Sequence, residues 1–330
     1  MNKSRSNPSD TAESAWRQHA EVLRVGGIAD QASLNDAARF LQRYCLRIIE
    51  TTRHELEGSY GWDLTKFDAF IVENPEANAQ LLHHEGRYGI VMYSGLPEQM
   101  HSYLQAALAA KEFLHLYITV EEREEWAFRF LGLVVEHVYL HECAHALRGH
   151  LLYLEQRNKN VTLDEKSRWQ RRYIEIDADF HGLDMWFEIT EAASDFPTSE
   201  SLILDLYFQK LLTVIMLHHL YDKEGLPVLR RGVSTHPAPI HRAMIIDHML
   251  FTTFMNRYQI PRSKMLNMQN QAWWEASVAA KAAGLVKNRW WGESGVRRGD
   301  QQYKRMWRYF VTHVEPRLNR FVDGLPDDLV

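Results

Sequence analysis

Two histidines with a glutamate beside them form the segment best suited to chemistry, His141-Glu142-Cys143-Ala144-His145. On a helix, residues four apart lie about one turn apart on the same face, so both imidazoles can reach a single metal ion. The glutamate after the first histidine lies next to them, where it can accept a proton from an attacking water without being a ligand. The alternative is a helix with incidental histidines, since His137 one turn earlier makes another such pair.

A catalytic zinc site needs a third protein ligand and an open position. Candidates lie in the next predicted long helix, in Glu175-Ile176-Asp177-Ala178-Asp179. Glu175 and Asp179 share a helix face, while Asp177 points elsewhere. One carboxylate can bind the metal, and the other can accept the spare N–H of a ligand histidine and fix its tautomer. His181 is a weaker rival because its helical phase differs, and a solvated acidic face is the alternative to any site.

These motifs, in this order, resemble the gluzincin peptidases of the CAAX prenyl protease and HtpX type, which carry H-E-x-x-H followed by E-x-x-A-D. Two further segments agree with that family. Asn78-Ala79, followed by glycine, isoleucine and valine over 86–96, is similar to a stretch that forms its small substrate-binding sheet. Ser234-Thr235-His236-Pro237, followed by His241-Arg242, is similar to its S-T-H-P…R-I motif. The resemblance covers roughly residues 74–245.

The resemblance implies a minigluzincin core that holds one Zn²⁺ ion. It implies His141, His145 and Glu175 as zinc ligands. It makes Glu142 the general base and later the proton donor, and it places Asp179 behind a ligand histidine as its orienting carboxylate. Membrane members of the family have transmembrane helices and exported members have signal peptides. This chain shows neither, so we expect a relative without a membrane span.

The remaining motif residues take roles around the metal in this family. The resemblance puts His236 on a loop, where it either donates a hydrogen bond to the developing oxyanion or occupies the open zinc position and holds the enzyme latent. Arg242 either pairs with Asp179 or binds substrate. Asn78 and Ala79 belong to the substrate edge, which we place at residues 79–84, where an extended peptide can add as a strand.

The elements that must position these residues are mainly helical, so the predicted class is α+β, predominantly α-helical, with a small antiparallel sheet. Short alternating segments bounded by turn residues predict strands at 67–72, 79–84 and 88–93. Helical periodicity predicts helices at 14–25, 34–57, 97–116, 121–157, 163–193, 199–222, 238–258, 262–283 and 301–322.

Three parts follow from this organisation. We expect an N-terminal helical segment with a disordered lead at 1–60, a zinc peptidase core at 61–258 and a C-terminal helical extension at 259–330. The extension is rich in tryptophan and arginine, a combination that can stack single-stranded nucleic acid. Packing of the tryptophans onto the core is the favoured interpretation.

Composition excludes several classes of protein. The 330 residues hold 38 Lys and Arg against 43 Asp and Glu, a net charge of −5, so no nucleic-acid partner is expected. The two cysteines make no disulfide framework, and Cys143 points away from both pentad histidines. The most apolar stretch, 202–220, is interrupted by charges and is typical of a buried helix. The first 15 residues have no apolar centre, so we expect a cytoplasmic protein.

Two functions fit these observations. The first is a zinc metalloendopeptidase that hydrolyses peptide bonds of a protein or peptide substrate. The alternative is a protease-like metal-binding module with a regulatory or interaction role and little catalysis. The presence of every chemistry-bearing residue favours the enzyme. Constitutive activity and activation by a partner both stay open.

Overall fold

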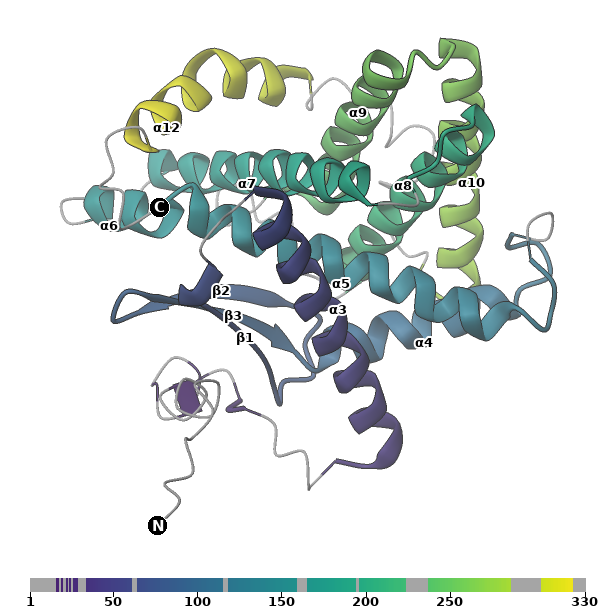
Figure 1. The fold of residues 1–330 in the computed structure, drawn as a ribbon, viewed down its shortest axis with the longest axis horizontal. Coiled ribbons are helices and arrows are strands. Elements are labelled where there is room, and N and C mark those ends of the chain that lie inside the picture. Colours follow the sequence, from purple (N-terminus) through teal and green to yellow (C-terminus); the bar gives the residue numbers. More distant parts are fainter. Residues whose placement is uncertain are drawn as a thin grey trace. The chain divides into compact units, whose positions relative to one another are not determined.

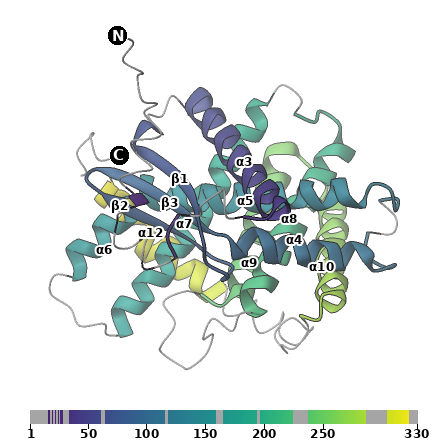
Figure 2. The same ribbon diagram turned by 90° about the horizontal axis from the view of Figure 1, so that it is seen from below.

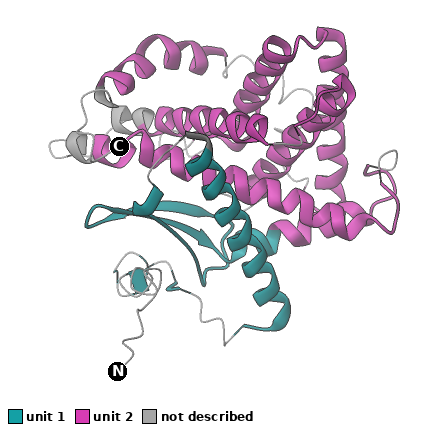
Figure 3. Ribbon diagram, in the orientation of Figure 1, with its two compact units in different colours: residues 1–99 teal, residues 100–330 magenta. Residues whose placement is uncertain are grey.

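The computed structural model describes residues 16–17, 19, 22, 24, 26–28, 34–60, 64–114, 118–158, 165–193, 196–223, 237–285 and 304–322. These residues are mainly helical and include one small three-stranded sheet, so the predicted class of a mostly helical α+β protein is confirmed (Figure 1). The chain divides into two compact units, residues 1–99 and 100–330 (Figure 3). The predicted boundaries after residues 60 and 258 stay predictions.

The first unit contains helix α3 and the sheet. Helix α3 spans Asp36–Tyr60, and the strands are β1 (Phe67–Val72), β2 (Ala79–His84) and β3 (Arg87–Tyr93). The strand order is β1-β3-β2, with β3 antiparallel to β2 but parallel to β1. The predicted antiparallel sheet is therefore wrong for one of its two pairings.

The hairpin between β2 and β3 explains the mixed sheet. Glu85 and Gly86 both have positive φ angles, 49° and 75°, which suit a tight two-residue turn. The turn makes β3 antiparallel to β2, and since β2 runs opposite to β1, β3 pairs with β1 in parallel. Strand β2 pairs with β3 alone among the described residues, so it lies at one edge of this sheet; its role in binding substrate stays a prediction.

The second unit is a set of packed helices (Figures 1 and 2). Helix α4 (Gly95–Ala109) crosses the division between the units in sequence. The closest helix pairs are α5 with α7, α8 with α9 and α8 with α10. The helices after α4 are α5 (Arg123–Leu147), α6 (His150–Asn158), α7 (Glu165–Ala192), α8 (Glu200–Lys223), α9 (Pro239–Tyr258), α10 (Arg262–Ala282), a π-helical turn η3 (Phe310–Val314) and α12 (Glu315–Val322).

The predicted single helix over 121–157 is wrong, because the chain breaks at Arg148 and Gly149. Gly149 has φ +60°, a left-handed conformation that glycine adopts without steric cost and that commonly ends helices. The N–H of Arg148 donates to the carbonyl of Ala144, and the N–H of Gly149 donates to that of Ala146. Helix α6 then starts in a new direction, with His150 as its first residue.

Helices α5 and α7 touch backbone to backbone at the metal-binding motif. A Cβ atom added to Gly182 of α7 would lie 3.1 Å from the backbone nitrogen of His141 and 3.2 Å from its Cα. Only glycine fits this approach without a shift of the helices. The contact brings the carboxylates of α7 within reach of the histidines of α5.

Helix α8 is the one described helix long and apolar enough to cross a membrane, and 72% of its apolar window is buried within the fold. This burial is typical of a core helix, and the absence of a membrane span stays a prediction. Some of the C-terminal aromatic residues pack against the helices as expected, whereas Trp274 is exposed. Trp307 lies against Phe180, and Tyr309 stacks on Tyr173 of α7, with ring centroids 6.1 and 5.1 Å apart.

Candidate metal site

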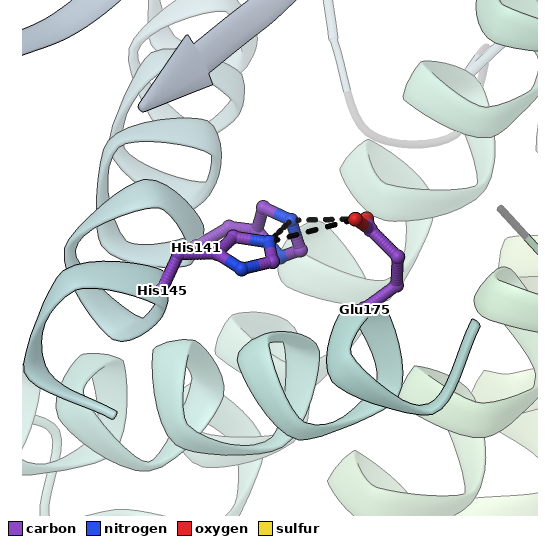
Figure 4. Close-up of side chains that lie close together, drawn as sticks. All are labelled: His141, His145 and Glu175. Carbon is purple, nitrogen blue, oxygen red and sulfur yellow. Dashed lines mark hydrogen bonds and ion pairs between the residues drawn. The ribbon is translucent and has the colours of Figure 1, made fainter. Parts of the chain in front are cut away.

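Two histidines of α5 and one glutamate of α7 point at a common centre (Figure 4). The Nε2 atoms of His141 and His145 lie 3.1 Å apart. The Glu175 carboxylate lies 3.5 Å from the first of these nitrogens and 3.7 Å from the second. Ligand atoms at the usual 2.0–2.1 Å from a tetrahedral zinc ion are roughly 3.3 Å from one another, so this donor set fits zinc. The three side chains are 9–14% exposed, so the centre is largely shielded from solvent.

A carboxylate and an arginine lie behind His141. Asp179 Oδ1 is 2.9 Å from His141 Nδ1, and its side chain is completely buried. A carboxylate at this distance accepts the Nδ1–H and leaves the Nε2 lone pair for a metal. Arg242 of α9 donates to both oxygens of Asp179, at 2.8 and 2.5 Å, and its Nη1 lies 3.4 Å from Glu175. Of the two roles expected for Arg242, the structure shows the pairing with Asp179.

A different group lies behind His145. His150 Nδ1 is 2.9 Å from His145 Nδ1, and His150 Nε2 is 2.9 Å from Asp177 Oδ2. Arg148 donates to the same carboxylate at 2.9 Å. Asp177 therefore points away from the metal-facing side of α7, as predicted, yet it reaches His145 indirectly through His150, a link that the sequence patterns did not predict. The signal that could have revealed this link is Gly149, which ends α5 and turns the chain back.

The surroundings set opposite pKa shifts on the two histidines. Burial and Arg242 lower the pKa of His141, but Asp179 and Glu175 outweigh them and raise it to about 9. Burial lowers the pKa of His145 well below its usual value. At neutral pH the metal-free site therefore holds a proton on His141, which a metal ion must displace.

Burial alone raises the pKa of both aspartates, yet the hydrogen bonds and positive charges around them prevail. His150 and Arg148 hold the pKa of Asp177 below its usual range, and Arg242 and His141 do the same for Asp179. Both carboxylates are therefore anionic at neutral pH, as acceptors of histidine N–H groups must be.

Glu142 and the end of α8 complete the surroundings of the metal centre. Glu142 is 7% exposed on α5, directly after the first ligand. Tyr221 of α8 lies within electrostatic range of Glu142, Glu175, Asp179 and Arg242, and its ring contacts that of His218. Nothing in the sequence patterns pointed to Tyr221, because no motif connects α8 with the pentad.

The other expected residues have different outcomes. His236 lies outside the described residues. Asn78 and Ala79 belong to the first unit, where Ala79 begins edge strand β2. His181 is outside the ligand cluster, with its Nε2 3.7 Å from Asp177. Cys143 is fully buried, as predicted for a core residue.

Comparisons of the chain with protein-family models, with curated proteins and with solved structures find no match. The resemblance to the gluzincin peptidases therefore rests on the four sequence motifs and stays a prediction.

Proposed function

We propose that the chain is a zinc-dependent endopeptidase of the gluzincin type. One observation carries the proposal: three donor atoms from two packed helices converge at the spacing that a single tetrahedral zinc ion requires. His141, His145 and Glu175 would hold the ion, which when bound supplies Lewis acidity toward water and toward a carbonyl oxygen. Three protein ligands with an open fourth position are typical of catalytic rather than structural zinc sites.

The chain's own residues account for the proton transfers of peptide hydrolysis. Glu142, buried beside the ligands, accepts a proton from the attacking water and returns it to the leaving amine. Asp179 and Arg242 keep His141 and Glu175 oriented while charge develops. His236 remains a proposed oxyanion donor or a latent ligand. An extended peptide adding as a strand to β2, which pairs with β3 alone among the described residues, is the proposed mode of substrate binding.

The decisive experiment replaces the proposed general base. Glu142→Gln is expected to keep zinc at the level of the unaltered chain and to lower peptide cleavage by a factor of about 10² to 10⁴. Zinc is measured by elemental analysis, and cleavage with a fluorogenic peptide library and by mapping new N-termini in a cell extract. Glu125→Gln, which removes an exposed glutamate from the same helix, is the matched control. Equal cleavage by the Glu142→Gln and unaltered proteins would exclude the mechanism.

The competing function predicts a different result. A protease-like metal-binding module would bind zinc through the same three ligands but would produce no new N-termini with either protein. Chelation followed by zinc addition separates the two functions, because only an enzyme loses and regains cleavage activity.

A further inference from the structure

The contacts behind His145 form a continuous chain of polar groups that ends at the C-terminal helix. His145 contacts His150, His150 contacts Asp177, and Asp177 is held by Arg148. His150 and Asp177 are completely buried, so water does not compete for these bonds. Arg148 also donates to Asn319 of α12 at 2.5 Å.

The direction of each hydrogen bond in this chain follows from chemistry. An ionised carboxylate only accepts, so His150 Nε2 must carry the proton that Asp177 accepts. A neutral imidazole with a protonated Nε2 has a lone pair on Nδ1, so His150 accepts a hydrogen bond from His145 Nδ1–H. His145 Nε2 then carries a lone pair, and it faces His141 Nε2 at 3.1 Å, where the metal ion would bind.

We propose that His150 is a positioning residue for the metal site: with Asp177 it fixes the tautomer and orientation of His145 through a hydrogen-bond relay. The inference rests on the proposed metal site and deepens it. The relay replaces the single carboxylate or carbonyl that usually holds a ligand histidine. It depends on the turn at Gly149, which brings the first residue of α6 back to the last turn of α5.

Zinc affinity, measured by competition with a chromophoric chelator, tests the relay without reference to peptidase activity. His150→Leu keeps the approximate volume but removes both polar atoms, and we expect zinc affinity to fall about 10- to 100-fold. His150→Gln offers an amide oxygen to His145 and an N–H to Asp177, and we expect it to stay within about threefold of the unaltered chain. The absorption of bound Co²⁺ reports whether the coordination geometry changes with the affinity.

His181→Leu is the matched control. It removes another partly buried histidine near Asp177 that lies outside the ligand cluster, so zinc affinity should not change. Equal zinc affinity in His150→Leu and the unaltered chain would overturn the relay, and so would equal losses in His150→Leu and His150→Gln. If His150→Leu does not fold, Asp177→Asn decides, with a loss of about three- to tenfold expected and no loss contradicting the relay. Absence of zinc binding by the unaltered chain would instead refute the proposed function.

Discussion

Asp177 and Asp179 lie two residues apart on the same helix, are both completely buried and are both paired with an arginine. They nevertheless serve the two proposed ligand histidines in different ways. Asp179 contacts His141 directly, whereas Asp177 reaches His145 only through His150. Residues two apart on a helix point about 200° from each other, so only one of the two carboxylates can face the metal. The second ligand is supported because the neighbouring chain turns back to bridge the gap.

The two arginines should differ most in their contribution to stability. Their side chains are equally exposed, at 13%, but Arg242 neutralises two carboxylates and Arg148 only one. Arg242→Met leaves buried negative charge uncompensated, so the free energy of unfolding of the metal-free protein should fall by about 3–5 kcal/mol. Arg148→Met should cost roughly half as much, because removing either partner of a buried pair is costly but only one carboxylate is affected. Urea denaturation measures the free energy of unfolding of both variants. Equal losses would show that Arg242 and Arg148 contribute equally to stability.

The two aspartates should differ in their effect on metal binding. Asp179→Asn weakens a direct contact with a ligand, and a loss of zinc affinity of about 10- to 100-fold is expected. The loss should exceed that of Asp177→Asn, which acts through His150. Asp184→Asn, at an exposed position of α7, is the control. A larger loss of zinc affinity in Asp177→Asn than in Asp179→Asn would contradict the assignment of Asp179 as the direct partner of a ligand histidine and Asp177 as the indirect one.

The pH dependence of zinc binding should depend on the protonation of His141 and not on that of His145. Burial and Arg242 lower the pKa of His141, Asp179 and Glu175 raise it to about 9, and zinc must displace the proton. Apparent zinc affinity should therefore rise by up to about tenfold per pH unit from pH 7 and level off near pH 9. Asp179→Asn should flatten this dependence, whereas Asp177→Asn should leave it. Titration calorimetry in buffers of different ionisation enthalpy counts the released proton, and a count of zero at pH 7 would contradict the assignment.

A substitution at the helix break, Gly149→Ala, should have the smallest effect on stability, and it should also lower zinc affinity. Gly149→Ala places a Cβ in a left-handed conformation, at an expected cost of about 1–2 kcal/mol. Because the turn positions His150, zinc affinity should also fall, by less than in His150→Leu. Gly284→Ala is a suitable control, since Gly284 also has a positive φ, ends α10 and meets no atom within 4 Å of an added Cβ. Equal zinc affinity in Gly149→Ala and Gly284→Ala would show that the turn at Gly149 does not contribute to metal binding.

Local patterns predicted much of the fold because they reflect interactions along one segment of chain. The three strands were found at their observed positions, apart from one extra residue at the start of β3, because apolar alternation and turn residues bound each of them. The direction of β1 relative to β3 was predicted wrongly, because it depends on how separate segments of the chain pair. The break at Gly149 was missed because the helical periodicity continues on both sides of it.

The sequence by itself determined which donor atoms share a helix face: His141 with His145, and Glu175 with Asp179, since both pairs follow from helical geometry. Only the tertiary structure decided that the two faces meet, through the backbone contact at Gly182. It also decided that Arg242, 63 residues from Asp179 in the chain, pairs with the carboxylate behind His141. It likewise placed His150 between His145 and Asp177. Buried charges need partners from whichever elements pack around them, and no spacing within one segment encodes those partners.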